Sequence, residues 1–274
     1  MTRRLPVNLI LGAGLVATIA AMALLSLVWT PHDFAQLAIR NRFAPPSEVH
    51  WLGTDQLGRD VVSQLMVGAR NSMAVALIAV SIGAALGVSF GLLASALGGW
   101  VEDAVMRVAD IGFAFPTLLF AIMLTAVFGP SLNIAIAAIA FINIPVFARV
   151  ARASANQIWT REFVMAARAA GQSRLAITRD HILPNIAAPV IVQMTIEFAV
   201  AILAEAALSY LGLGAQPPQP SWGRMLAEAQ TLMYISPQLA IYPGLCIVAA
   251  VLGFSLLGDG LRDVTDPRLV RARA

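Results

Sequence analysis

Lysine is absent from this sequence, because all 18 basic residues are arginine. A P-loop holds nucleotide phosphates with a lysine, and pyridoxal enzymes bind their cofactor through one, so neither a Walker-type ATPase nor a Schiff-base enzyme is expected. The one cysteine, Cys246, excludes an internal disulfide. Charge is scarce as well, since charged residues make up 12% of the chain, against about 25% in soluble domains.

The chain is instead rich in long apolar runs, and hydrophobic residues make up 59% of it. Each run is close to the roughly 20 residues that a membrane helix needs. No A-x-A cleavage pattern follows the first run, so it is expected to be retained rather than removed as a signal peptide. The predicted spans are 7–29, 73–97, 111–129, 132–148, 186–208 and 239–258. The sequence therefore predicts an all-α polytopic membrane protein with six transmembrane helices.

Glycines recur every four residues in the second predicted span, at Gly83, Gly87 and Gly91. A ridge of this kind lets two helix backbones approach closely. Packing within one subunit is favoured over an interface between subunits.

The arginines are distributed unevenly about the predicted spans. Five fall on one side, namely Arg40, Arg42, Arg59, Arg70 and Arg224, and the other 13 fall on the opposite side. By the positive-inside bias, both termini are expected in the cytoplasm. Because the arginines flank apolar spans instead of forming a basic soluble module, no nucleic-acid partner is expected.

The segment 149–185 is the longest between spans on the arginine-rich side and has a helix, turn, helix pattern. Gly171 permits the tight turn, Ser173 can cap the second helix, and Pro184 is expected to end it. A short helical hairpin of this kind is expected to fit into a groove on a partner protein. Its arginines, among them Arg168, Arg174 and Arg179, engage either acidic groups on a docked subunit or anionic lipid headgroups.

The fifth predicted span carries a polar row at four-residue spacing: Gln193, Glu197, Ala201, Glu205 and Ser209. A carboxylate in a bilayer is costly unless it is paired, protonated or hydrated, so this row is expected to face the bundle interior or a water-filled path. Glu197 either lines that path or forms an interhelical hydrogen bond. Glu205, nearer the outer end, is expected to meet water.

The outer segments offer weaker signals. His50, Asp55 and Asp60 lack the tight spacing of a metal site, and none is predicted. Thr54 or Asp55 is expected to cap a short surface helix, and Arg59 to form local hydrogen bonds beside Asp60. The 217–220 segment is expected to be an extended outer loop, with Trp222 near the membrane interface.

Two stretches of the helical hairpin, Glu162-Phe-Val-Met-Ala-Ala-Arg-Ala-Ala-Gly171 and His181-Ile-Leu-Pro-Asn185, resemble the EAA loop of binding-protein-dependent ABC importer permeases. In that family the loop forms the coupling helix that docks on the ATPase. Met165 departs from the usual acidic residue and His181 from a branched apolar one. The resemblance implies an ATPase-coupling loop that contains Glu162, Ala166, Ala167, Arg168, Gly171, Arg174, Leu183 and Pro184.

Three further segments resemble the second permease subunit of the dipeptide, oligopeptide and nickel branch. They are 51–60, 208–223 and 257–268. The resemblance implies a type I ABC importer permease fold, with an N-terminal helix and periplasmic loop at 1–68, a permease core at 69–260 and a cytoplasmic tail at 261–274. The implied place is the cell inner membrane, and Gln193, Glu197, Glu205 and Ser209 are the expected translocation path.

The implied partners are a homologous permease subunit, cytoplasmic ATPase subunits and an extracytoplasmic substrate-binding protein. No cofactor is expected in this chain, because ATP is used by the partner subunit. The implied mechanism is alternating access driven by closure of the ATPase pair. Cargo within the branch includes dipeptides, longer or modified peptides and nickel chelates.

Two other classes are weighed against this interpretation. A proton-coupled secondary transporter would use Glu197 and Glu205 as a relay, but the two repeated halves typical of such carriers are not evident. A membrane enzyme would need a nucleophile, a base and an orienting group close together, and the sequence offers no such cluster.

Overall fold

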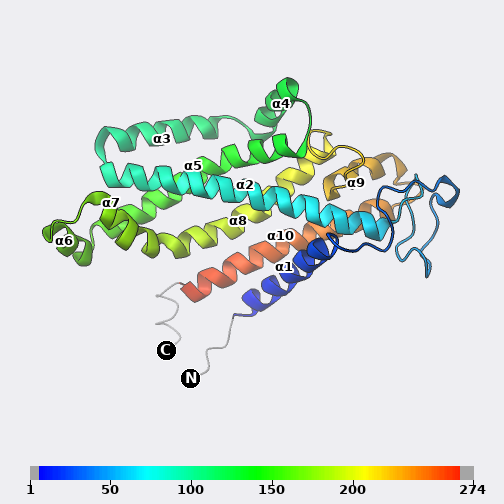
Figure 1. Cartoon of the computed structure of the whole chain (residues 1–274), viewed down its shortest axis with the longest axis horizontal. Coiled ribbons are helices and arrows are strands. Elements are labelled where there is room, and N and C mark those ends of the chain that lie inside the picture. Colours follow the sequence, from blue (N-terminus) through cyan, green and yellow to red (C-terminus); the bar gives the residue numbers. More distant parts are fainter. Residues whose placement is uncertain (1–5, 266–274) are drawn as a thin grey trace.

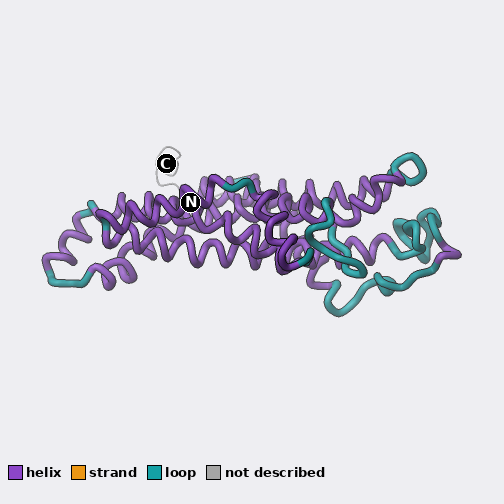
Figure 2. The backbone as a smooth tube through the Cα atoms, turned by 90° about the horizontal axis from the view of Figure 1, so that it is seen from above, coloured by secondary structure: helices purple, strands orange, loops and turns teal. Residues whose placement is uncertain are grey.

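The computed structural model describes residues 6–265 and shows an elongated helical bundle (Figure 1). Most of the long helices run along one axis, and the longer loops gather mainly at one end (Figure 2). The described residues form no β-strand. The long helices are α1 (Val7–Leu25), α2 (Val61–Leu97), α3 (Gly99–Ala114), α4 (Thr117–Phe128), α5 (Leu132–Trp159), α8 (Leu183–Tyr210) and α10 (Gln238–Thr265). The short helices are α6 (Glu162–Ala169), α7 (Arg174–Ile177), α9 (Trp222–Ala229), η1 (Ile39–Asn41), η2 (Thr178–Ile182) and η3 (Gln230–Leu232).

Five segments of the described chain are long and apolar enough to cross a membrane, and the bent pair α3 and α4 makes a sixth if it counts as one span. The prediction of one straight helix over 111–129 is wrong, because α3 and α4 meet at an angle of 82°. Phe115 has extended backbone angles and Pro116 follows it. The ring of a proline disfavours helical angles in the residue before it, which explains the break.

The second span is longer than predicted, because α2 begins at Val61 and not near Met73. The side chain of Asp60 accepts a hydrogen bond from the Ser63 N–H and caps this helix. The first turns mix polar and small residues that pack inside the protein, so their hydropathy does not reveal the helix. The prediction that Thr54 or Asp55 caps a separate surface helix is wrong.

The glycine ridge of α2 packs against α5 within this chain. A Cβ added to Gly87 would lie 2.7 Å from the Phe147 Cβ, and one added to Gly91 would lie 2.9 Å from the Ala151 Cβ. Real Cβ atoms essentially never approach this closely. The ridge therefore serves packing within the subunit, which confirms the favoured interpretation.

The hairpin of α6 and α7 and the 26–60 segment lie at opposite ends of the bundle (Figure 1). Helix α1 begins, and α10 ends, toward the end that carries α6. The tail beyond Thr265, including Asp266 and Arg268 of the predicted motif, lies outside the described residues.

Helix α7 continues through the π turn η2 into α8 without a break. The prediction that Pro184 ends the second hairpin helix is therefore wrong. A proline lacks the N–H of a helical hydrogen bond and its ring crowds the carbonyl four residues earlier. The π turn over Thr178–Ile182 changes the hydrogen-bond register just before Pro184, so the chain continues as a helix.

Candidate functional site

The hairpin between α6 and α7 turns at Gly171. This glycine has φ of +82°, and its N–H donates to the carbonyl of Arg168 at 3.0 Å. A residue with a side chain is strained at this φ, so glycine suits the turn. The Ser173 hydroxyl accepts from the Ala176 N–H at 3.2 Å. The predicted turn and the predicted cap are both confirmed.

A small apolar cluster holds the hairpin to the bundle. Val164 of α6 and Ile177 of α7 are fully buried, and they pack with Leu92 of α2 and Ala155 of α5. The opposite surface of α6 is open, with 52% of Met165 exposed. Of the predicted coupling residues, Ala167 is half-buried and the others are exposed, namely Glu162, Ala166, Arg168, Gly171, Arg174, Leu183 and Pro184. The hairpin thus presents an exposed surface in which small residues lie beside the large apolar side chains of Phe163, Met165 and Leu175.

Arg174 connects the hairpin to the end of α2. Its Nη1 donates to the backbone carbonyls of Ala96 at 2.7 Å and Leu97 at 3.0 Å. These carbonyls belong to the last turn of α2, where a cation is favourable for the helix dipole. Arg174 therefore joins the hairpin to the C-terminal end of α2 through two hydrogen bonds.

His181, one of the two departures from the family pattern, braces the two helices of the hairpin. Its Nε2 lies 3.2 Å from Oε1 of Gln172, and its ring meets the Phe163 ring edge to face at 6.2 Å. Arg179 pairs with the adjacent Asp180 at 2.7 Å. Among the described residues Arg168 forms no ion pair.

Two ion pairs join α3 to α5 and were not found from the sequence. Arg152 bonds Glu102, and Arg149 bonds Asp110. The guanidinium of Arg149 also lies 4.2 Å from the centroid of the Phe113 ring. The partners lie some 40 to 50 residues apart in the chain, so helical spacing carried no signal for them.

The polar row of α8 divides into two parts. Gln193 donates to Glu197 at 2.8 Å, and both side chains are half-buried. Glu205 is 0% exposed, and it accepts hydrogen bonds from Ser72 of α2 at 2.7 Å and Ser209 at 2.6 Å. The prediction that Glu205 meets water is wrong for this chain, because these hydroxyls and the surrounding helices enclose it.

The 211–221 segment folds back over the bundle beside Glu205, where the Ala215 N–H donates to the Ser209 hydroxyl at 3.0 Å. The Nε1 of Trp222 donates to the carbonyl of Leu65 at 3.2 Å, and Trp222 is 0% exposed. Asn71 donates to the carbonyl of Pro220 at 2.7 Å. The ring of Trp222 thus packs in the protein core, and its place near the membrane interface stays a prediction.

A buried network fixes the other end of the protein. The carboxylate of Asp55 accepts from Nε of Arg59 at 2.6 Å and from Gln64 at 2.9 Å. Arg59 also bonds Glu228 of α9 at 2.6 Å. Burial alone would lower the pKa of the Arg59 guanidinium, but the two carboxylates raise it above its usual value. The predicted local hydrogen bond of Arg59 is confirmed by its bond to Asp55, four residues earlier, whereas its bond to Glu228 lies 169 residues away and was not predicted.

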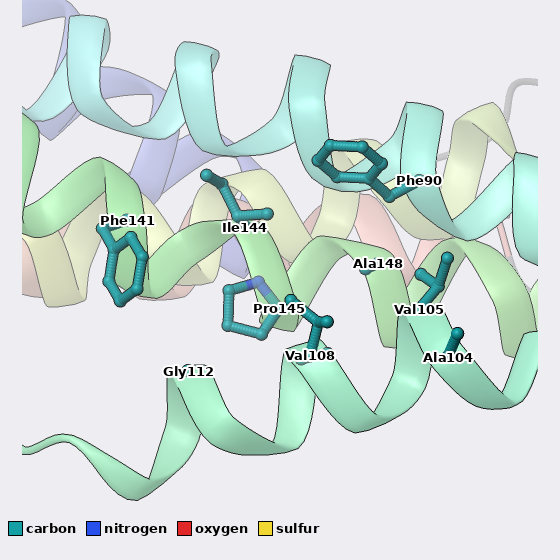
Figure 3. Close-up of a pocket in the computed structure, with 10 residues that line it drawn as sticks. Phe90, Ala104, Val105, Val108, Gly112, Phe141, Ile144, Pro145 and Ala148 are labelled. Carbon is teal, nitrogen blue, oxygen red and sulfur yellow. The ribbon is translucent and has the colours of Figure 1, made fainter.

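A groove of about 310 Å³ lies between α2, α3 and α5 (Figure 3). Its lining residues are Phe90, Ala104, Val105, Val108, Ala109, Gly112, Phe141, Ile144, Pro145 and Ala148. All of these side chains are apolar, so the groove offers no partner for the charged ends of a peptide. The polar row of α8 is the better candidate for a solute path.

A multi-pass helical bundle with an exposed two-helix hairpin at one end, and polar side chains along one long inner helix, is the architecture of a membrane permease. The chain belongs to the family described as binding-protein-dependent transport system inner membrane component, whose model matches residues 83–271. It is the transmembrane permease subunit of an ATP-binding-cassette importer. This outcome confirms the resemblance and favours the importer over the proton-coupled carrier.

The most similar relatives include two kinds of permease. The chain is 41% identical to the dipeptide transport system permease protein DppC of Alkalihalophilus pseudofirmus, over 95% of this chain and 86% of that protein. It is 46% identical to the glutathione transport system permease protein GsiD of Escherichia coli O6:K15:H31, over 82% and 74%. An inward-facing structure of the MetNI methionine ABC transporter matches with a TM-score of 0.59 at 19% identity, over 77% of this chain and 96% of the matched chain. That similarity confirms the fold.

Proposed function

We propose that this subunit imports short peptides or peptide-like solutes such as glutathione, and that its hairpin couples the path to a separate ATPase. The supporting observation is the exposed surface of the hairpin, whose second helix α7 is bonded to α2 through Arg174. The named relatives are dipeptide and glutathione permeases. The partners would be a homologous permease subunit, cytoplasmic ATPase subunits that use the ATP, and an extracytoplasmic binding protein.

The hairpin fixes the orientation under this proposal. A surface that docks on a cytoplasmic ATPase must lie in the cytoplasm. Because α1 begins and α10 ends toward the same end of the bundle, both termini face the cytoplasm of a cell inner membrane (Figure 1). The arginine bias points the same way.

The path follows the part of α8 that its own chain does not enclose. Gln193 and Glu197 are half-buried and bonded to one another, so a partner permease can complete a polar lining there. Glu205 lies beyond this segment and bonds Ser72 of α2, and Ser209 bonds Glu205 within α8. In this role Glu205 and Ser209 position α8, and Gln193 and Glu197 face the solute.

The test is reconstitution of the complete importer in proteoliposomes with its binding protein. We expect ATP-dependent uptake of a labelled dipeptide or of glutathione, with no loss when a protonophore is added. Glu197→Gln should change the KM for uptake several-fold while the ATPase rate stays near the wild-type value. Glu48→Gln, the same chemical change on an exposed outer loop, is the control.

Two results would contradict the proposal. Uptake by this chain alone, driven by a proton gradient, would remove the coupling role of the hairpin. Uptake of neither peptide nor glutathione by a complex whose ATPase responds to another solute would remove the assigned cargo class.

A further inference from the structure

Two histidines and a carboxylate converge at the outer-loop end of α2, at the opposite end of the bundle from the hairpin (Figure 1). His32 follows the end of α1, His50 lies in the second half of the 26–60 segment, and Asp60 caps α2. Their ligand atoms all lie within 4.8 Å of one another. The tertiary fold, and not the sequence spacing, brings them together.

We propose that His32, His50 and Asp60 bind one divalent transition-metal cation of the Zn²⁺ class. The Asp60 Oδ1 lies 2.9 Å from the His50 Nδ1 and 3.6 Å from the His32 Nδ1. Tetrahedral ligands at about 2.0–2.1 Å from Zn²⁺ are themselves separated by about 3.3 Å. The two separations bracket that value, so a cation fits after small side-chain movements.

The surrounding hydrogen bonds leave the right atoms available. The other carboxylate oxygen of Asp60, Oδ2, accepts from both the N–H and the hydroxyl of Ser63 at 2.8 Å. This leaves Oδ1 directed at the two imidazole rings. Ser63 also accepts from the His32 N–H at 3.0 Å, which holds the His32 backbone beside the site. Such partners orient metal ligands in known sites.

A buried imidazole nitrogen is a second observation that points to a ligand at this site. The Nδ1 of His32 is buried and has no hydrogen-bond partner among the described residues. Asp60 is 2% exposed, and its ionic contacts in residues 6–265 are with the two histidines and not with any arginine. A cation would satisfy the imidazole nitrogen and neutralise the buried carboxylate at once.

The donor set selects the class of metal. One carboxylate and two imidazoles suit borderline cations such as Zn²⁺, Ni²⁺ and Cu²⁺, whereas Ca²⁺ and Mg²⁺ prefer six or more oxygen ligands. The His32 side chain is 34% exposed, so water can supply a fourth ligand. Asp55 takes no part, because its carboxylate is already bonded to Arg59 and Gln64. The cation would fasten the 26–60 segment to the start of α2.

The test uses the purified full chain in detergent, stripped with a chelator and titrated with Zn²⁺ against a chromophoric competitor. We expect one Zn²⁺ per chain and a rise in thermal unfolding temperature on saturation. His32→Ala and His50→Ala should each weaken binding by at least about 100-fold, and Ser63→Ala by about 10-fold, as for partners of metal ligands. His181→Ala, which removes the third histidine of the sequence from the hairpin, should leave the affinity unchanged.

Asp60→Asn keeps a helix-capping side chain and so separates loss of the ligand from loss of the fold. It should elute as a monodisperse species and bind Zn²⁺ at least about 10-fold more weakly than the wild-type chain. Wild-type affinity in His32→Ala, or equal losses in His181→Ala and His50→Ala, would overturn the site. In that case His50 would be a hydrogen-bonding partner of Asp60, and His32 a neighbouring ring without a ligand role.

Discussion

Adding a methyl group to Gly87 should force α2 away from α5. The new Cβ would lie 2.7 Å from the Phe147 Cβ, and ordinary contact begins at 3.4 Å, so this contact must lengthen by 0.7 Å. Overpacking of this kind costs about 1–3 kcal/mol. Gly14→Ala is the matched control, because a Cβ there meets nothing within 4 Å and gains the same helix propensity, about 1 kcal/mol. Gly87→Ala should therefore be about 1–3 kcal/mol less stable than Gly14→Ala.

The same geometry predicts that a second substitution adds little. A Cβ on Gly91 meets the Ala151 Cβ at 2.9 Å, on the same pair of helices. One separation of α2 from α5 relieves both contacts, so the double variant should cost less than the sum of the single variants. Denaturant titration of the protein in lipid nanodiscs gives the three free energies. Equal stability of Gly87→Ala and Gly14→Ala, or strict additivity of the double variant, would refute the packing argument.

Three further changes test the remaining contacts. Glu228→Ala leaves Arg59 with one carboxylate and should lower stability by about 1–2 kcal/mol. This loss is smaller than that expected for breaking a fully buried ion pair, because the Glu228 side chain is 23% exposed. An unchanged unfolding temperature would contradict the prediction. Glu205→Ala leaves two buried hydroxyls without their acceptor and should lower the free energy of unfolding by about 2–4 kcal/mol. Glu205→Gln should lower it less, because the amide keeps an acceptor oxygen. Equal losses for the two variants in denaturant titration would argue against the enclosed carboxylate. Arg174→Ala should change stability by less than about 1 kcal/mol, since its side chain is exposed. The same variant should reduce substrate-stimulated ATP hydrolysis in the reconstituted importer. Full stimulation would contradict a coupling role for the contact between the hairpin and α2.

Much of the fold follows from hydropathy alone, because membrane spans must be long and apolar. The hairpin also follows from local chemistry, since Gly171 and Ser173 act through their own backbone and their near neighbours. The break at Pro116 was missed because hydropathy is continuous across it. The presence of a proline does not by itself predict a helix break either, because Pro184 lies in a continuous helix after a π turn.

The candidate site was predictable only where neighbours lie one helical turn apart. Gln193 and Glu197 share a face of α8 and bond one another. The enclosure of Glu205 depends on Ser72, 133 residues earlier in the chain. The cluster of His32, His50 and Asp60 likewise comes from loop folding, which no residue spacing encodes.

The most direct test of the account compares two glycine-to-proline substitutions in the reconstituted importer. Gly171 and Gly129 both have positive φ and both donate a backbone hydrogen bond, but only Gly171 lies in the hairpin. Proline fixes φ near −65° and removes the donor at either position. The account predicts an assembled complex that loses substrate-stimulated ATP hydrolysis in Gly171→Pro and keeps it in Gly129→Pro. Retained stimulation in Gly171→Pro would contradict coupling through the hairpin.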